Sequence, residues 1–196
     1  MKNQSSKVAG LDEAGRGPLA GPVFAAAVVL PDELPASLRG LNDSKKLSAA
    51  KREELFGAIQ RDALAWCIAE ASVEEIEELN ILNASLLSMR RALQGLGLQP
   101  ECALVDGNQD PKLGIPTELI IKGDSKEKCI SAASILAKVA RDRRMLELHA
   151  QYPQYGFDKH MGYGTQLHRD AILTHGPCPI HRKLFIRNVE QIRLAL

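Results

Sequence analysis

The sequence predicts an α/β protein: a mixed β-sheet flanked by helices, with a further helical region at the C-terminal end. Two observations support this prediction. Strand-like apolar runs open the chain, and similar runs then alternate with helical patterns. The length of 196 residues fits a single domain with its own apolar core. We expect about residues 1–150 to form the sheet and its helices, and about residues 151–196 to form a loop and the last helices.

Strands are expected where short runs rich in Val, Ala, Leu and Ile are bounded by glycine, proline or polar residues. These runs cover residues 8–11, 23–30, 65–71, 103–105 and 119–122. A glycine-rich connection joins the first two runs. Trp66 lies within the third run, and we expect its ring to lie in the core.

Helices are expected where apolar residues recur every three or four positions. They cover residues 48–60, 72–79, 84–94, 127–149, 166–174 and 189–196. Ser48 is a typical N-cap, and Gly95 and Gly97 are expected to end the third helix. The segment 152–164 is rich in proline, glycine and aromatic residues, so we expect a loop there.

Composition argues against several classes of protein. The N-terminal residues MKNQSSK lack the apolar stretch of a signal peptide, and the longest apolar run, residues 23–30, is too short to span a bilayer. The four cysteines form no CxxC pair, which argues against a zinc site or a disulfide framework. We therefore expect a cytoplasmic protein with reduced cysteines and no membrane partner.

The distribution of charge leaves a polyanionic partner open. The net charge is only +1, but basic residues cluster at residues 45–46, 51–52, 141–144 and 181–183. Such clusters can follow a phosphate backbone when the acidic residues are concentrated elsewhere in the chain. The alternative interpretation is that each cluster is ordinary solvated surface.

Acidic residues follow three of the predicted strands. They are Asp12 and Glu13 after the first strand, Asp106 after the fourth and Asp124 after the fifth. Strand ends of one α/β sheet lie near one another, and ligands bind there. Carboxylates gathered in a cleft repel one another and need a cation, and hard oxygen ligands suit Mg²⁺ or Mn²⁺. Two such ions, about 3.5–4 Å apart, could clamp the attacking and leaving oxygens of a phosphodiester.

The adjacent acids present a geometric difficulty. Neighbouring residues on a regular strand point to opposite faces, so Asp12 and Glu13 cannot both enter one site from ideal β-structure. Either the strand breaks at the following Ala14-Gly15, or the backbone carbonyl of Glu13 contributes. The competing interpretation is a plain turn at each strand end. It is the better one for any single aspartate, but three similar strand ends weaken it.

The glycine-rich segment Gly15-Arg16-Gly17-Pro18 follows the first acidic pair. Glycine lets the backbone approach a ligand closely and point N–H groups at it. The segment is not a Walker P-loop, because no Lys-Ser/Thr follows, and not a dinucleotide fingerprint, because a strand comes next. Beside a metal site, it would supply the backbone donors that recognition of a sugar-phosphate needs.

Five successive segments resemble the motifs of bacterial ribonuclease HII, a type 2 ribonuclease H. They are DEAGRGPLAGPV, LNDSKKLS, LVDGN, KGDSKEKCISAASILAKVARDR and YGFDKHMGYGT, and the resemblance runs from residue 8 to about residue 189. The first and fourth motifs are the specific ones. The resemblance implies a ribonuclease-H-like mixed sheet with a C-terminal helical region, which agrees with the elements expected above.

The resemblance also implies roles for individual residues. The four metal-binding acids of the family match Asp12, Glu13, Asp106 and Asp124. Asp142, which residue chemistry alone would make the alternative fourth acid, is not among them. The loop that contacts the 2′-hydroxyl and the neighbouring phosphate matches Gly15, Arg16 and Gly17, and the tyrosine that packs on the sugar matches Tyr163. The basic residues near the nucleic-acid backbone match Lys45 and Lys46.

The implied activity is that of a metal-dependent endoribonuclease using Mg²⁺ or Mn²⁺, with two ions in the substrate complex. It would hydrolyse the RNA strand of RNA/DNA hybrids and nick 5′ of single ribonucleotides in duplex DNA. The products would carry 3′-hydroxyl and 5′-phosphate ends, and the reaction would support removal of ribonucleotides from DNA. A 2′-hydroxyl is the group by which a protein distinguishes RNA from DNA. We expect the chain to act as a monomer.

Two positions depart from the family pattern. Met161 stands where a lysine is usual, which removes one possible phosphate contact, and Leu184 replaces a usual serine. His160, His168 and His181 have no ligand-like spacing, and we do not expect them to touch substrate.

Two other functions compete with this one. A binding module that no longer cuts would lack a carboxylate, and all four are present. A different metal nuclease of the same broad fold, such as a recombinase or resolvase, would have the acids without the glycine-arginine-glycine loop and the tyrosine.

Overall fold

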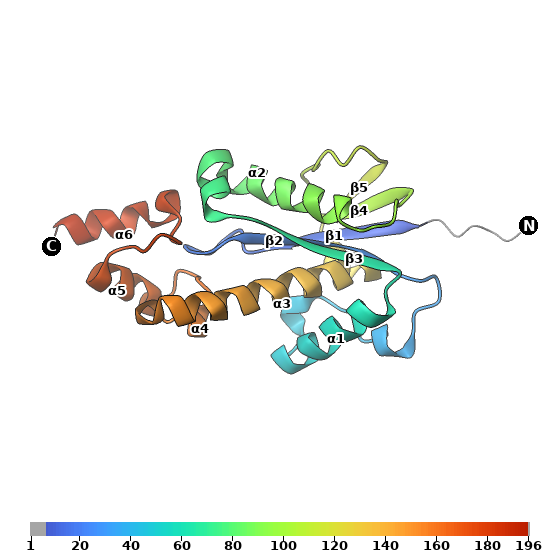
Figure 1. The fold of residues 1–196 in the computed structure, drawn as a ribbon, viewed down its shortest axis with the longest axis horizontal. Coiled ribbons are helices and arrows are strands. Elements are labelled where there is room, and N and C mark those ends of the chain that lie inside the picture. Colours follow the sequence, from blue (N-terminus) through green and yellow to red (C-terminus); the bar gives the residue numbers. More distant parts are fainter. Residues whose placement is uncertain (1–6, 196) are drawn as a thin grey trace, which may run out of the picture.

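The computed structural model describes residues 7–195 as a five-stranded mixed sheet covered by helices on both faces (Figure 1). The strands are β1 (Val8–Ala14), β2 (Val23–Val29), β3 (Ala65–Ala71), β4 (Cys102–Asp106) and β5 (Thr117–Ile120), in the order β3-β2-β1-β4-β5. The pairs β1–β2 and β2–β3 are antiparallel, and the pairs β1–β4 and β4–β5 are parallel. The prediction of an α/β fold with a mixed sheet is confirmed.

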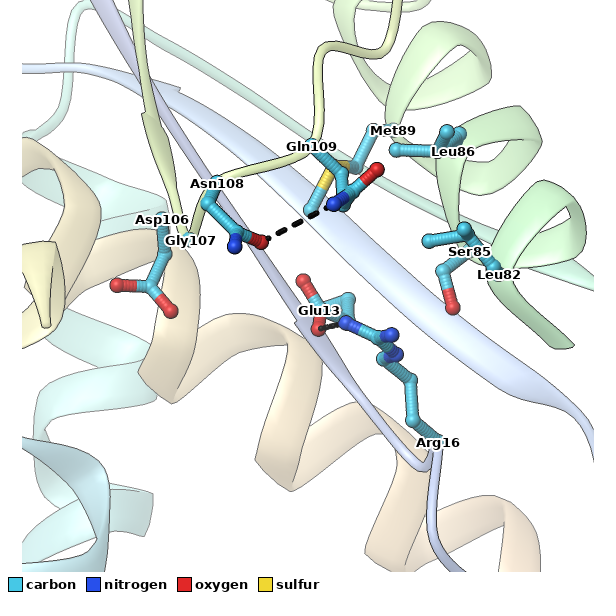
Figure 2. Close-up of a pocket in the computed structure, with 10 residues that line it drawn as sticks. All are labelled: Glu13, Arg16, Leu82, Ser85, Leu86, Met89, Asp106, Gly107, Asn108 and Gln109. Atoms are coloured by element: carbon cyan, nitrogen blue, oxygen red, sulfur yellow. Dashed lines mark hydrogen bonds and ion pairs between the residues drawn. The ribbon is translucent and has the colours of Figure 1, made fainter. Parts of the chain in front are cut away.

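The central strand β1 runs past the end of its neighbour β4. The last pair between them is Leu11 with Val105, whereas pairing of β1 with β2 continues to Ala14. Figure 2 shows Glu13 and Asp106 projecting at this end of the sheet. The overhang leaves the edge of β1 without a strand partner on the β4 side, and the candidate site lies there.

The helices divide between the two faces and one end of the sheet. α1 (Ala49–Asp62) and α3 (Lys128–Gln151) cover one face, and α2 (Val73–Gln94) covers the other (Figure 1). The C-terminal region, α4 (Phe157–His160), α5 (Gln166–His175) and α6 (Lys183–Ala195), packs beside the far end of α3. Single turns of 3-10 helix, η1 (Ala36–Leu38), η2 (Ser44–Lys46), η3 (Gly123–Ser125) and η4 (Pro153–Tyr155), complete the fold.

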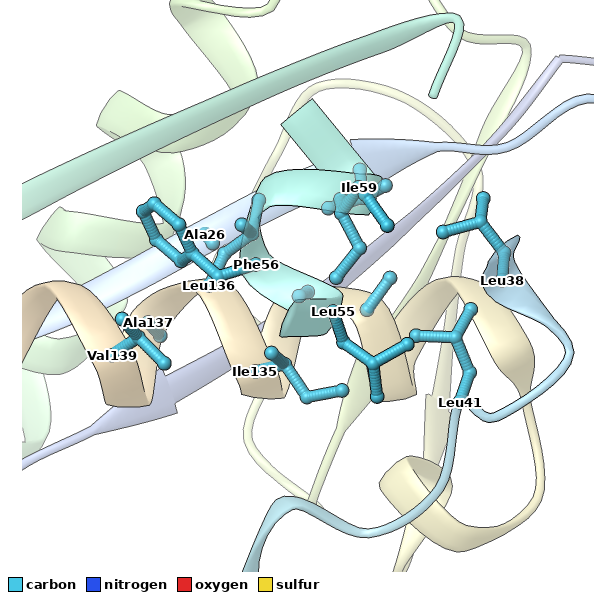
Figure 3. Packing of buried hydrophobic residues seen from close by; sticks show 14 residues of the cluster. Ala26, Leu38, Leu41, Leu55, Phe56, Ile59, Ile135, Leu136, Ala137 and Val139 are labelled. Atoms are coloured by element: carbon cyan, nitrogen blue, oxygen red, sulfur yellow. The ribbon is translucent and has the colours of Figure 1, made fainter. Parts of the chain in front are cut away.

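Successive side chains of β2 point to opposite faces of the sheet and contribute to a hydrophobic core on each face. Ala26 and Val28 pack against α1 and α3 (Figure 3), whereas Ala25 and Ala27 pack on the opposite side with residues of α2. These small side chains let the helices approach closely. The approach is also close at Gly10 of β1, where an added Cβ would lie 2.2 Å from the backbone carbon of Cys129 in α3. Trp66 packs partly buried against the first cluster and donates from Nε1 to the carbonyl of Gln60 at 3.0 Å.

Side chains at the helix ends explain several boundaries. The Ser48 hydroxyl accepts from the Lys51 N–H and begins α1, as expected. Ser72 and Glu75 form a capping box at the start of α2. The two helices expected at 72–79 and 84–94 are the two halves of α2, which is kinked at Asn80, where φ is +67°. The Asn80 side chain accepts from the N–H groups of Leu82 and Asn83, which restarts the helix.

Four sequence-based boundaries were wrong. β1 continues through both acids because its pairing with β2 persists. β5 ends at Ile120, since Lys122 adopts a left-handed conformation, and Asp124 therefore lies in η3. The segment 152–164 is not all loop, because it contains η4 and α4. α6 begins at Lys183 rather than at residue 189, and the expected last residue, 196, lies outside the described residues.

Over residues 7–195, no helix combines the length and the apolarity that crossing a membrane requires.

Candidate active site

One cleft contains most of the residues that the sequence singles out. It lies where β1, β4 and η3 end against η2, α3 and the loop before α5. Its lining residues are Asp12, Glu13, Ala14, Gly15, Arg16, Gly17, Ser44, Lys45, Asp106, Asp124, Ser134, Lys138 and Tyr163. The structure thus brings together the four acids, the glycine-arginine-glycine loop, Lys45 and Tyr163. Lys46 is not part of this lining; it is exposed and lies 3.8 Å from the carboxylate of Asp43.

The overhang of β1 explains how two adjacent acids reach one site. Asp12 pairs with Ala26, which packs against α3, and Glu13 pairs with Ala25, which faces α2. The two side chains therefore point to opposite faces of the sheet, as strand geometry requires. Glu13 lines both the cleft and an adjoining pocket beside α2, where Figure 2 places it next to Arg16. Because β4 no longer flanks β1 here, Glu13 is accessible from the cleft.

Asp12 is the most buried of the four acids, with 6% of its surface exposed. Burial raises the pKa of its carboxyl well above the ordinary value, and the negative charges of Glu13 and Asp106 raise it further. A hydrogen bond from Ser134 and one from the Glu13 N–H, at 2.7 Å, act in the opposite direction. The side chain is thus held in place while its charge is disfavoured.

The other acids are influenced by the same cluster. Burial raises the pKa of Glu13, and Arg16, 3.4 Å away, opposes the rise. Burial also raises the pKa of Asp124, with further contributions from Asp43 and Asp106. Asp106 accepts from the Gly123 N–H at 2.6 Å, which ties the end of β4 to the turn that carries Asp124.

The donor set of the cleft fits a hard divalent cation. All four side chains offer carboxylate oxygens, which suit Mg²⁺ or Mn²⁺. Burial, and after it the charges of neighbouring carboxylates, raise the pKa values of Asp12 and Asp124, and a bound cation would offset both effects. As the side chains of residues 7–195 stand, no group of three or more His, Cys, Asp or Glu residues is arranged to hold an ion. Coordination therefore requires these carboxylates to turn toward the ion.

The glycine-rich loop after β1 borders the other side of the cleft. Gly15 has a φ of +103°, and a Cβ there would lie 2.1 Å from Nε of Arg141, so only glycine fits. Tyr163 is 44% exposed, and an added Cβ on Gly17 would lie 3.8 Å from its ring. The loop and the tyrosine thus face each other across a short gap.

Two of the predicted basic clusters are not continuous surface patches. Arg141 is 1% exposed, and His181 and Arg182 are 3% and 0% exposed. Neither alternative, a phosphate-binding patch or solvated surface, holds for these three side chains, because they contact backbone carbonyls and rings inside the protein. Arg144, on the outside of α3, pairs with Glu147 at 2.9 Å.

The sequence reasoning missed three polar residues of the cleft. Ser134 hydrogen-bonds to Asp12 and shares a 2.9 Å hydrogen bond with Ser44. Lys138 lines the cleft one helical turn further along and pairs with Asp142 at 2.7 Å. The spacing of Ser134, Lys138 and Asp142 along α3 could have indicated a shared helix face. Asp142 itself is not among the residues that line the cleft.

The three histidines lie in the interior of the C-terminal region. His168 and His181 approach each other at 3.0 Å between their Nε2 atoms, and the rings of His160 and His168 stack at 4.5 Å. None of the three lines the cleft. Met161 is partly buried against an apolar cluster of this region that includes Phe157 and Ile172, whereas Leu184 is exposed.

Comparisons with known proteins identify relatives of the chain. The sequence model of the family Ribonuclease HII matches residues 9–188. The chain is 62% identical to a ribonuclease HII of Delftia acidovorans over 96% of its length and 79% of the relative, and 60% identical to one of Albidiferax ferrireducens over 96% and 90%.

Several solved structures share the fold. The ribonuclease H2 of Pyrococcus horikoshii is similar over 97% of this chain and all of that chain, with a TM-score of 0.81 and 30% identity. The ribonuclease HII in a PCNA complex from Archaeoglobus fulgidus has a TM-score of 0.76 and 29% identity, covering 90% of this chain and 93% of that one. A Bst-RNase HIII in complex with Mn²⁺, 17% identical, covers 98% of this chain and 66% of that one with a TM-score of 0.64 and shares the fold.

Proposed function

Because the chain belongs to the ribonuclease HII family and is thereby an endoribonuclease, we propose that it nicks duplex DNA 5′ of single ribonucleotides and hydrolyses the RNA strand of RNA/DNA hybrids. The products carry 3′-hydroxyl and 5′-phosphate ends. The observation that supports this proposal is a single cleft in which four carboxylates adjoin the glycine-arginine-glycine loop and Tyr163. The carboxylates account for hydrolysis, and the loop and tyrosine account for the choice of a ribonucleotide.

Asp12, Glu13, Asp106 and Asp124 would hold the metal ions, Mg²⁺ or Mn²⁺, two in the substrate complex. When bound, the ions supply an activated water and neutralise charge on the phosphate under attack. Ser134 orients Asp12 through its hydrogen bond, and the Gly123 N–H orients Asp106. Lys45 and Lys138, on the same cleft, provide positive charge for the flanking phosphates.

Selectivity comes from the sugar side of the cleft. The N–H groups of Arg16 and Gly17 have no acceptor among the described residues, so they are available to a 2′-hydroxyl and its phosphate. Tyr163 packs on the sugar next to them. A site built to hydrogen-bond a hydroxyl rejects the analogue without it by about 10⁴–10⁵-fold, because its own polar groups are left unpaired.

We further propose that the chain acts as one domain, as a monomer, and in the cytoplasm. The match of the family model to residues 9–188 supports a single unit.

A cleavage assay tests the proposed function. A duplex with one ribonucleotide is expected to be nicked on the 5′ side of that residue with Mg²⁺ or Mn²⁺, while the same duplex made only of DNA stays intact. Equal cutting of both duplexes, or full activity in EDTA, contradicts the proposal.

A pair of variants tests the choice of the fourth acid. Asp124→Asn is expected to abolish turnover, whereas Asp142→Asn keeps it, because Asp142 does not line the cleft and only pairs with Lys138, which does. The reverse result would assign the fourth position to Asp142.

A further inference from the structure

Two arginines are buried behind the glycine-rich loop without a carboxylate partner. Arg141 of α3 is 1% exposed and Arg182 is 0% exposed, and within residues 7–195 neither forms an ion pair. Burial lowers the pKa of the Arg182 guanidinium to about 9, which still leaves it charged at neutral pH. A buried charge is costly unless polar groups surround it. The polar groups that accept hydrogen bonds from these two guanidinium groups therefore indicate what the arginines do.

The compensating groups are the backbone carbonyls of the loop. Arg182 donates from its guanidinium to the carbonyls of Gly15 (2.7 Å), Arg16 (3.0 Å), Pro18 (2.9 Å), Gly21 (2.7 Å) and Pro22 (3.3 Å). Its backbone N–H donates to the carbonyl of Leu19 at 2.8 Å, and Arg141 donates to the carbonyls of Ala20 and Pro22, both at 3.2 Å. Within residues 15–22, every carbonyl except that of Gly17 thus faces one of these two arginines.

This arrangement fixes which backbone groups the loop presents to the cleft. With its carbonyls directed inward, the loop leaves the N–H groups of Arg16 and Gly17 without an acceptor among the described residues, and both residues line the cleft. The N–H groups further along are used inside the protein, since Leu19 donates to Gly162 and Gly21 donates to Ile180. A loop with outward N–H groups is an anion-binding and hydroxyl-binding surface.

Arg141 also connects the loop to the tyrosine. Its Nη1 donates to the carbonyl of Met161 at 3.0 Å, two residues before Tyr163, and its Cζ lies 5.9 Å from the centre of the Tyr163 ring. The same guanidinium therefore touches both halves of the surface that faces the sugar. A displacement of Arg141 would move the loop and the tyrosine together.

We propose that Arg141 and Arg182 are positioning residues for ribonucleotide recognition, which hold the loop with its Arg16 and Gly17 N–H groups directed at the 2′-hydroxyl and its phosphate. The inference rests on the proposed function. Two positive charges behind the loop also favour the phosphate that the loop contacts. The arginines act through the loop and do not touch the substrate themselves.

The test compares Arg182→Lys with Arg144→Lys, a matched change of a partly exposed arginine that pairs with Glu147. Lysine keeps the positive charge but loses the fixed fork of donors that reaches several carbonyls at once. The readout is a preference, defined as the Ki of an all-DNA duplex, acting as a competitor, divided by the KM of the same duplex with one ribonucleotide. We expect Arg182→Lys to lower this preference by about tenfold or more, at a nearly unchanged Ki, because one mispositioned hydrogen bond is worth about that factor. Arg144→Lys leaves both quantities unchanged.

A purely structural role gives a different result. Loss of stability alone lowers the fraction of active enzyme and kcat but leaves the preference intact. Unchanged preference in folded Arg182→Lys therefore overturns the inference. A wild-type enzyme without any preference overturns the proposed function instead, so the two failures are distinguishable.

A measurement on the unaltered protein covers the case in which Arg182→Lys does not fold. Hydrogen exchange of the Arg16 and Gly17 amides is expected to slow on addition of the ribonucleotide duplex, in Ca²⁺ to suppress cleavage, and not on addition of the all-DNA duplex. In a wild-type enzyme that does prefer the ribonucleotide duplex, absence of this difference overturns the inference, since these N–H groups would then not be the ones presented.

Discussion

Replacing Gly15 by alanine probes the contact between the loop and Arg141 most sharply. The added Cβ would lie 2.1 Å from Nε, 2.4 Å from Cδ and 3.1 Å from Cζ of Arg141. Such a clash is mild when a flexible side chain can swing away. Arg141 cannot do so, because it is buried and donates to the carbonyls of Ala20, Pro22 and Met161.

The expected loss of stability has two parts. The φ of +103° at Gly15 strains any L-residue by about 1–2 kcal/mol. Displacement of Arg141 breaks one or two hydrogen bonds of a charged group, each worth about 1.5–3 kcal/mol. Together these give about 2.5–8 kcal/mol of lost unfolding free energy for Gly15→Ala. Because the loop moves, cleavage of a single-ribonucleotide duplex is expected to fall with it.

Gly107→Ala is the matched control for backbone strain. Gly107 has a similar φ of +98°, but its added Cβ would meet nothing within 4 Å, so only the strain of about 1–2 kcal/mol applies. Urea unfolding followed by circular dichroism measures both variants. An equal loss of stability in the two would refute the assigned contact between the loop and Arg141.

Three further predictions concern charge, pH and the sugar contact. Asp12→Asn is expected to raise the thermal midpoint of the metal-free protein while abolishing cleavage, because burial and two neighbouring acids disfavour the charge it removes; a lower midpoint would contradict this. Burial lowers the pKa of His168 and of His181 from 6.5 to about 4, so the unfolded chain binds their protons first and stability falls as the pH drops from 6.5 toward 4. The loss is about 2 kcal/mol per histidine at about pH 5. The raised pKa of Asp12 has the opposite effect on stability as the pH falls, so the loss should be measured as urea midpoints of Asp12→Asn. A midpoint independent of pH would exclude it. Tyr163→Phe is expected to raise the KM of the single-ribonucleotide duplex by about tenfold without changing the Ki of the DNA duplex, and an equal change in both would argue against a contact with the 2′-hydroxyl.

Features encoded in local sequence were predictable. Strands rich in valine and alanine, and the capping residue Ser48, follow from side-chain preferences over a few positions. The placement of Asp106 at the end of a strand follows as well, because the apolar run stops there. The gathering of Asp12, Asp106 and Asp124 in one cleft could be expected because neighbouring strand ends of a sheet meet in space.

Features that depend on distant partners were not predictable. Arg182 was grouped with a basic cluster because its neighbours in sequence are basic. It is buried instead, and it donates to carbonyls of a loop that lies more than 150 residues earlier in the chain. The access of Glu13 to the cleft depends on where β4 stops pairing with β1, which no local pattern reveals.

The most direct test of the metal site is calorimetric titration of Mn²⁺ into the wild-type protein, Asp124→Asn and Asp142→Asn. Asp124 lines the cleft beside the other acids, whereas Asp142 is paired with Lys138. We predict that Asp124→Asn weakens Mn²⁺ binding by about tenfold or more, as loss of a charged ligand should, while Asp142→Asn binds like the wild type. Equal binding by all three proteins would contradict the assignment of the four carboxylates as the metal site.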